Sequence, residues 1–166
     1  MAKQNIKSKK GFTIIEVVLV LAIAGLIFLM VFIALPALQR SQRDTQRRDD
    51  MARFISQLSQ RQANNSGKVP DLTTSAYTDF INNYLKAGGD TFQDPSTGTD
   101  YKVVKVTKCK SGSCTNTTTG DNAQMGKISV YSNARCDGEN PSYVQGDRKI
   151  AITIKLEGAG IYCGNN

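Results

Sequence analysis

An unbroken apolar run near the N-terminus constrains this chain more than any other feature. From Val17 to Leu35 no side chain is charged or strongly polar. A helix that crosses a bilayer needs about 20 predominantly apolar residues, and lipid leaves the backbone no hydrogen-bond partners outside such a helix. The run therefore predicts a membrane-spanning helix. Residues 1–11, which come before it, contain four lysines and no acidic residue (Lys3, Lys7, Lys9 and Lys10). By the positive-inside rule the N-terminus is expected in the cytoplasm and most of the chain outside.

A carboxylate, Glu16, stands at the start of this run, a few residues after Gly11 and Phe12. An ionisable group in a membrane segment is costly, which makes it a functional candidate by default. A cut between Gly11 and Phe12 would give Phe12 a positively charged amino group. In an assembled bundle of helices, Glu16 of one subunit would then neutralise that amine on a neighbour.

The N-terminal segment consists of lysines, then Gly11-Phe12-Thr13-Ile14-Ile15-Glu16, then an apolar helix. This order resembles the class III signal of type IV pilins and pseudopilins. The resemblance implies a prepilin peptidase that cleaves between Gly11 and Phe12 and methylates Phe12, with Glu16 as the assembly carboxylate. It also implies, as partners, further copies of the chain and an assembly platform with its ATPase. Relatives often have a proline about three residues earlier in the helix than Pro36, so the place where this helix would loosen in a filament is not specified by the resemblance.

Two other interpretations of the N-terminus stay open. Ala22-Ile23-Ala24 has the A-x-A form of an ordinary secretory cleavage site, which would leave a chain that starts at Gly25. The segment could also be an uncleaved membrane anchor. The long apolar stretch after Ala24 and the position of Glu16 both disfavour the secretory signal.

Charge and cysteine content narrow the remaining function classes. The net charge is +7, but four of the 21 basic residues lie in residues 1–11, which leaves 17 against 14 acidic residues, or +3. That excess is too small to indicate nucleic-acid binding alone. The four cysteines are all expected outside the membrane, where disulfides form. We favour the pairs Cys109–Cys114 and Cys136–Cys163 among the three possible pairings. A zinc site is the alternative, but the chain has no histidine.

Residues 39–50 are polar and contain no helix breaker, so the helix is expected to continue beyond the membrane. Arg40–Asp44, Asp44–Arg48 and Asp49–Arg53 are candidate i,i+4 ion pairs. Arg40, Arg43 and Arg47 share one face, which indicates a solvated stalk or, alternatively, contacts with acids of neighbouring subunits. An amphipathic stripe follows at Met51, Phe54, Ile55 and Leu58. A single helix from Phe12 to Asn64 is predicted, ending before Gly67.

The sequence after Asn64 predicts a globular head of the α+β class. Helical spacing marks residues 75–85, and Asp94–Tyr101 is a turn cluster similar to an Asp-Pro-x-Gly-x-x-Tyr element of pseudopilins. Strands are expected at Tyr101–Val106, Lys127–Ser132 and Lys149–Leu156, the last half-buried against the amphipathic stripe. The expected fold is a long N-terminal helix with a three- or four-stranded antiparallel sheet. The expected organisation is a leader (1–11), a transmembrane and assembly helix (12–38), its extracytoplasmic continuation (39–64) and a globular head (65–166).

No catalytic constellation is visible, so we expect no enzyme, and we expect no cofactor and no metal site. Calcium at Asp137, Glu139 and Asp147 fits no known loop spacing, and a glycosylation sequon at Asn116 is weak evidence. The sequence favours a structural subunit of a type IV pilus, a fimbrium. The subunit would be a single-pass membrane protein first and part of an extracellular filament on the cell surface afterwards.

Two alternatives to a pilus subunit remain. The first is a pseudopilin of a type II secretion or DNA-uptake system. The second is a minor tip pilin that binds surfaces or DNA. For the second, a phosphate-binding patch could form from basic residues around one strand, namely Lys102, Lys105, Lys108 and Lys110 with Arg135.

Overall fold

The computed structural model describes residues 11–111, 114, 124–158 and 160–166. The chain forms two compact units, Met1–Leu38 and Gln39–Asn166. Most of the leader, residues 1–10, and the sequon at Asn116 lie outside the described residues.

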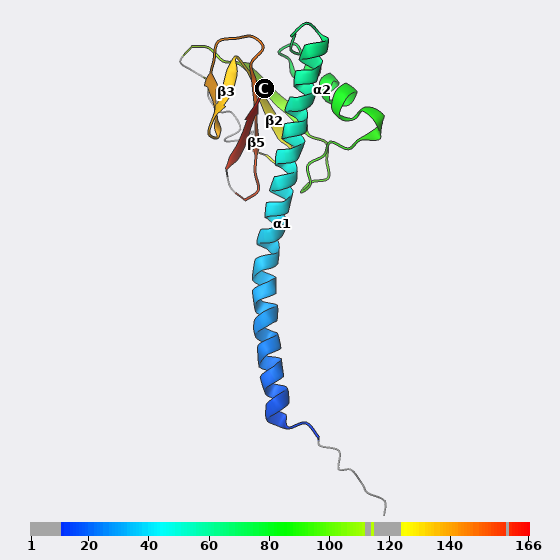
Figure 1. Cartoon of the computed structure of the whole chain (residues 1–166), viewed down its shortest axis with the longest axis vertical. Coiled ribbons are helices and arrows are strands. Elements are labelled where there is room, and N and C mark those ends of the chain that lie inside the picture. Colours follow the sequence, from blue (N-terminus) through cyan, green and yellow to red (C-terminus); the bar gives the residue numbers. More distant parts are fainter. Residues whose placement is uncertain (1–10, 112–113, 115–123, 159) are drawn as a thin grey trace, which may run out of the picture. The chain divides into compact units, whose positions relative to one another are not determined.

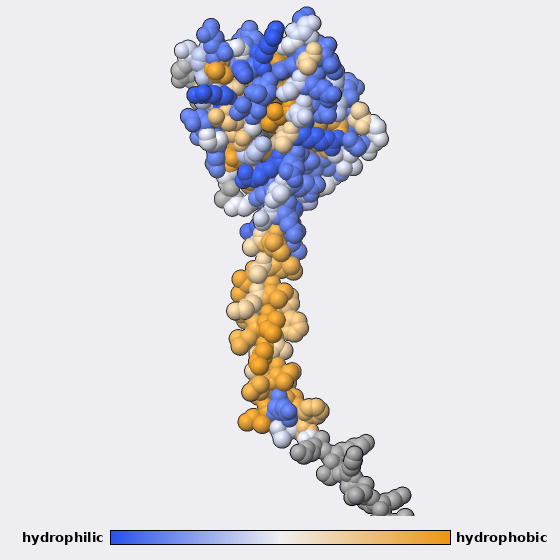
Figure 2. All heavy atoms as spheres, in the orientation of Figure 1, coloured by the Kyte–Doolittle hydropathy of each residue, from blue (hydrophilic) through white to orange (hydrophobic). Residues whose placement is uncertain are grey.

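Helix α1 runs from Ile14 to Asn64 with Pro36 inside it, close to the predicted span of Phe12–Asn64. In the first unit its large apolar side chains are all exposed, and Figure 2 shows hydrophobic residues covering this part of the helix. In the second unit one face of the same helix is buried, at Arg47, Met51, Phe54 and Leu58. Figure 2 shows a mostly hydrophilic surface over that unit. The helix therefore has two different surroundings because its two halves have different compositions.

A short helical segment follows α1. Helix α2 spans Thr74–Phe80, and the side chain of Thr73 caps it by accepting a hydrogen bond from the Ala76 amide at 3.2 Å. A π-helical turn, η1, continues over Ile81–Leu85, and a 3₁₀ turn, η2, covers Ala87–Gly89. The predicted helical stripe is confirmed, because its apolar members are buried or packed on the core: Tyr77, Phe80, Ile81, Tyr84 and Leu85.

The main sheet has four strands in the order β1-β2-β5-β6. Their bounds are Lys102–Lys108, Lys127–Ser132, Ile150–Lys155 and Ile161–Asn165. Strands β2, β5 and β6 are antiparallel neighbours, as predicted, but β1 pairs with β2 in parallel. The expectation of a purely antiparallel sheet is wrong at this pair. The connection from Lys108 to Lys127 exceeds the dozen or so residues that a parallel crossover needs.

A second sheet is a hairpin of β3 (Ala134–Asp137) and β4 (Asn140–Tyr143). Strands β3, β4 and β6 were not predicted from the sequence. Gly138 opens the turn of this hairpin with φ of 60°, a backbone conformation that favours glycine. The α+β class, with a long N-terminal helix and sheets, is confirmed.

The core of the second unit lies between α1 and one face of the main sheet, which run side by side in Figure 1. Phe54 is central and packs on the rings of Phe80, Tyr77 and Phe92. From the sheet, this core receives the isoleucines of β5 and of β2, at positions 128, 150, 152 and 154. The predicted contact between the helical stripe and β5 is thus present.

Strand β5 is buried on both faces, which corrects the expectation of a half-buried strand. A second apolar cluster covers its other face, where Ala151 packs with Tyr131, Ala134 and Cys109. Two disulfides border this cluster: Cys109–Cys114, and Cys136–Cys163 between β3 and β6. These are the two pairings that sequence analysis favours. The β3–β4 hairpin had no recognised strand signal, so the sequence did not predict a cover for this face.

The buried aromatic ring of Phe54 should hold the second unit together. Replacing Phe54 with Ala should lower the free energy of unfolding by about 3–5 kcal/mol because it leaves a cavity in the core. Phe28→Ala is the matched control, since Phe28 is 64% exposed in the first unit. Urea titration of the full chain in nonionic detergent, followed by the near-UV signal of the tyrosines, measures both. Equal stability of the two variants would contradict the assigned core.

Candidate functional site

The stretch from Gly11 to Glu16 is the first candidate site. Gly11, Phe12 and Thr13 are not helical, and α1 begins at Ile14. Phe12 is 86% exposed, and a Cβ placed on Gly11 would meet no other described residue within 4 Å, its chain neighbours apart. The peptide bond between Gly11 and Phe12 therefore lies in a non-helical, exposed segment, which suits a bond that a peptidase must reach.

Glu16 is the one charged residue between Gly11 and Leu38. It lies in the first turn of α1, where its amide donates a hydrogen bond to the Thr13 carbonyl at 3.1 Å. A carboxylate is favoured at a helix N-terminus because the exposed amides carry partial positive charge. A shallow apolar surface hollow lies around it, lined by Phe12, Glu16, Val17, Val20 and Leu21. Gly11, Phe12 and Glu16 are the residues that the sequence predicts for processing and assembly. They thus lie at one end of the helix.

The apolar surface of α1 after Glu16 has no cover within its own unit. Among the described residues, α1 is the helix that is long and apolar enough to cross a membrane, judged by length and composition alone. Large side chains around its whole circumference, such as Phe28, Met30 and Phe32, are more than half exposed. A helix that is apolar all round needs lipid or other protein around it.

The second candidate site is a group of charged residues at the start of the head, here called the Arg47 network: Arg43, Asp44, Arg47, Asp94 and Glu157. Arg47 is fully buried and donates two hydrogen bonds to the Asp94 carboxylate, from Nε at 2.7 Å and from Nη2 at 3.0 Å. Its Nη1 donates to Asp44 Oδ1 at 2.7 Å. The bidentate geometry to Asp94 is the strong form of an arginine–carboxylate pair.

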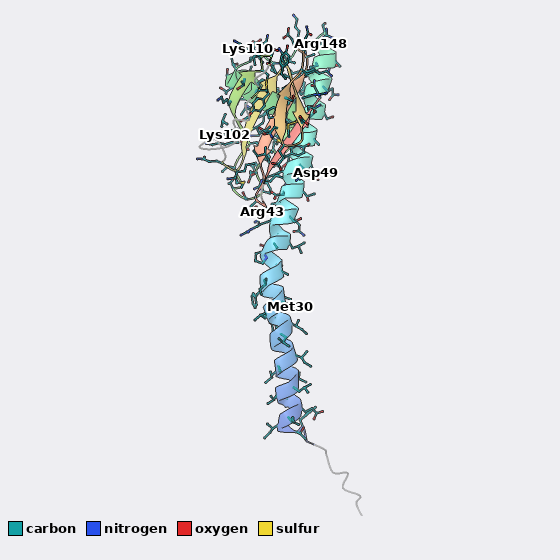
Figure 3. All side chains as sticks on the ribbon, turned by 90° about the vertical axis from the view of Figure 1, so that its left-hand side faces the viewer. Met30, Arg43, Asp49, Lys102, Lys110 and Arg148 are labelled. Carbon is teal, nitrogen blue, oxygen red and sulfur yellow. A yellow bond between two sulfur atoms is a disulfide. The ribbon has the colours of Figure 1, made fainter. Side chains whose placement is uncertain are left out.

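Asp44 and Arg43 extend the network to the loop between β5 and β6. The Asp44 carboxylate accepts hydrogen bonds from the amides of Glu157 and Gly158, each at 2.7 Å. Arg43 donates two hydrogen bonds of 2.7 Å to the Glu157 carboxylate (Figure 3 labels Arg43). Within the second unit, the helix is therefore fixed to the β5–β6 loop by side chains of Arg43 and Asp44.

The Asp94 turn is the other end of the network. The Asp94 carboxylate also accepts hydrogen bonds from the amide and hydroxyl of Ser96, at 2.9 and 2.6 Å. Gly98 has φ of 63° and donates its amide to the Asp94 carbonyl at 2.8 Å, which closes the turn. Tyr101, at the end of the turn, donates its hydroxyl to Asp50 at 3.1 Å. The turn similar to that of pseudopilins is thus the element that receives Arg47.

Burial and hydrogen bonding act in opposite directions on these charges. Burial raises the pKa of Asp94, but hydrogen bonds from Arg47 and Ser96 outweigh it and lower that pKa from its ordinary 3.8 to about 2. Burial lowers the pKa of Arg47, and its bonds to Asp94 and Asp44 raise it overall. Both groups are therefore charged at neutral pH, and the pair is a desolvated ion pair whose partners need each other.

The arrangement corrects the expectation for the polar part of the helix. Arg47 is not part of a solvated stalk, because its side chain is fully buried. Asp44 pairs with Arg47 instead of Arg40 or Arg48, and Arg53 pairs with Asp90. Arg40 is exposed, as expected.

A signal for the burial of Arg47 was present in the sequence. Arg47 precedes Met51, Phe54 and Leu58 by four, seven and eleven residues, so it continues the apolar stripe. The sequence carries no such signal for Glu157, so its contacts in the Arg47 network were not predicted.

Comparison with known families agrees with the N-terminal geometry. Residues 6–32 match the family described as the Prokaryotic N-terminal methylation motif. The chain therefore carries the class III signal peptide of type IV pilins. The motif supports a type IV pilin-like or pseudopilin precursor and points to a structural protein. No curated protein and no solved structure matches the chain.

The Arg47–Asp94 pair predicts a specific acid sensitivity. The lowered pKa of Asp94 contributes stability that is complete above its ordinary value of 3.8 and is lost as the pH falls towards about 2. Asp94→Asn should cost about 3–5 kcal/mol at neutral pH, because it leaves Arg47 buried without its counter-ion. The variant should also lose less further stability over that acidic window. Urea titrations at a series of pH values measure both effects.

Asp90→Asn is the control for this prediction. Asp90 also pairs with an arginine of α1, but its side chain is 63% exposed. An exposed pair contributes about 0–1 kcal/mol. A loss for Asp94→Asn no larger than that for Asp90→Asn would mean that the Arg47 network does not hold the head on the helix.

Proposed function

We propose that the chain is a structural subunit of a type IV pilus, polymerised through its N-terminal helix. One observation carries the proposal: the apolar surface of α1 is exposed on all sides and bears a lone carboxylate, Glu16, next to an accessible Gly11–Phe12 bond. An anchor alone would need the apolar surface but not this carboxylate. A subunit that moves from lipid into a helical fibre needs both.

Processing is the first step of the proposal. A prepilin peptidase cleaves the bond between Gly11 and Phe12, removes residues 1–11 and methylates the new amino group of Phe12. A methylated amine stays positively charged. It then pairs with Glu16 of a neighbouring subunit, and the pair brings each helix into register as it leaves the membrane. Pairing also removes the cost of placing one unpaired carboxylate among apolar side chains.

Burial of apolar surface would then hold the fibre together outside the membrane. Each large apolar side chain removed from water contributes about 1.5–3 kcal/mol, and the helix offers about 20 of them. Before assembly the same surface lies in the bilayer, with the N-terminus in the cytoplasm and the head outside. An assembly platform and an ATPase supply the work of moving the subunit from one surrounding to the other.

The alternative within the same family is a pseudopilin of a secretion or DNA-uptake system. The Asp94–Tyr101 turn favours it, because its Asp-Pro start and Tyr end match the pseudopilin element and it is built into the Arg47 network. Overexpression of the full chain with its own assembly machinery, followed by electron microscopy of sheared material, separates the two functions. Long, abundant surface filaments made of this chain support a pilus, and short or absent filaments support the pseudopilin.

Neutralising Glu16 should block assembly without blocking processing. Glu16→Gln keeps the shape of the side chain and removes the charge that pairs with the Phe12 amine. Breaking a desolvated pair costs about 3–5 kcal/mol, so the amount of the chain in sheared filaments should fall at least about tenfold. Immunoblots of the sheared and membrane fractions measure the distribution.

Asp49→Asn is the matched control, since it removes one exposed carboxylate from the head (Figure 3 labels Asp49). It should leave the filament fraction unchanged. Filaments of Glu16→Gln at the normal level would show that Glu16 is not the assembly carboxylate.

A further inference from the structure

Three lysines form a row across the face of the main sheet that points away from α1. Lys102 of β1 is the register partner of Lys127 of β2. Lys127 and Lys155 flank the pair Ile128–Ile154, so the antiparallel register of β2 and β5 sets them opposite each other. The isoleucines of that pair face the α1 core, so the lysines face the other way. We call Lys102, Lys127 and Lys155 the lysine row.

A fourth lysine and a buried hydroxyl adjoin the row. Lys105 is the register partner of Ser129, one position further along the same face. The Ser129 hydroxyl is buried and has no hydrogen-bond partner among the described residues. Buried polar atoms are almost always hydrogen-bonded, so an unpartnered one calls for an explanation. Because this hydroxyl is closed to solvent, it is not itself a contact for an external ligand, and the lysines are the groups that an anion can reach.

No salt bridge joins a lysine of the row to an acid within the described part of the chain, although the charge of Lys102 helps to lower the pKa of Asp100. Lys102 and Lys105 are exposed, and Lys127 and Lys155 are partly exposed. Two neighbouring acids are engaged elsewhere: Asp100 pairs with Lys86, and Glu157 pairs with Arg43. Like charges directly opposite each other destabilise a sheet. The lysines of the row therefore repel one another, and an external anion would remove this repulsion.

Protection of a sheet edge does not account for the row. Lysines on an edge strand discourage pairing with another chain, which explains Lys102 and Lys105 on β1. Strands β2 and β5 are the two central strands, so Lys127 and Lys155 protect no edge.

We propose that the lysine row binds the phosphate backbone of nucleic acid, without reading its sequence. Neighbouring strands are about 4.8 Å apart, so the row is a line of positive charge about 10 Å long. A nucleic-acid strand is likewise a line of charge, with one phosphate per about 3.4 Å of helix axis. The β3–β4 hairpin stands on the same sheet face beside the row. A flat bilayer would meet the hairpin first, whereas a linear polymer can lie alongside it.

This placement revises the basic patch inferred from the sequence. Lys108 pairs with Asp147, and Lys110 lies beyond the end of β1, away from Lys102 (Figure 3). Arg135 is on β3, in the other sheet. Lys102 and Lys105 remain, and the new members come from β2 and β5. The inference goes beyond the pilus function and does not depend on it, because every residue involved lies in the second unit.

The test is binding of a short labelled DNA duplex to the full chain held in phosphatidylcholine nanodiscs, followed by fluorescence anisotropy at several salt concentrations. The wild-type chain should bind with an affinity that falls as salt rises. Lys102→Gln/Lys127→Gln/Lys155→Gln should bind at least about tenfold more weakly, with a log–log salt slope smaller by about 2 to 3. The single variant Lys155→Gln should lower the slope by about 1.

A control variant removes the same charge elsewhere: Lys68→Gln/Lys110→Gln/Lys149→Gln. It should retain the wild-type salt slope. Equal losses in both triple variants, or none in either, would overturn the proposal, because binding would then reflect net charge or not exist.

A second arm replaces the duplex with phosphatidylglycerol vesicles. Row-dependent sedimentation with vesicles and no duplex binding would assign the row to lipid headgroups and also overturn the proposal. Thermal unfolding checks folding, and the row variant should melt no lower than wild type because it relieves repulsion.

Discussion

The exposed apolar surface of α1 between Ile14 and Leu38 cannot stay in water, and the organisation of the chain follows from this constraint. Twenty or so large side chains around one helix need lipid on every side or other helices on every side. The remaining residues must then fold as a separate polar unit joined to that helix. The chain divides there, with the compact units meeting at Leu38 and Gln39.

The head uses the second half of the same helix as part of its own core. Apolar contacts at Met51, Phe54 and Leu58 fix one face of the helix to the sheet. The Arg47 network adds directional contacts one to two turns earlier, to the turn before β1 and to the loop after β5. The bidentate hydrogen bonds to Asp94 give this part of the helix a defined position and orientation, which non-directional apolar packing alone does not provide.

Sequence analysis predicted the features with strong periodicity or a specific motif: the long helix, the stripe at residues 51–58, the α2 region and the strands β1, β2 and β5. It missed β3, β4 and β6 because these strands are short and carry polar residues and a proline, although Asp137-Gly138 was a usable turn signal. The parallel pairing of β1 depends on a long connection, which carries no local signal. The position of Arg47 on the apolar stripe indicates its burial, but its partner Asp94 is far away in the sequence, and such partnerships are not visible in local patterns.

The central claim is that this chain is cut after Gly11 and assembled through the helix that begins at the new N-terminus. Mass spectrometry of the N-terminal peptide, from protein sheared off the cell surface, tests that claim most directly. The account predicts a peptide that begins with N-methylated Phe12. A peptide that begins at Met1 or Ala2 would instead indicate an uncleaved anchor, and one that begins at Gly25 would indicate an ordinary secretory signal. Either result would contradict the account.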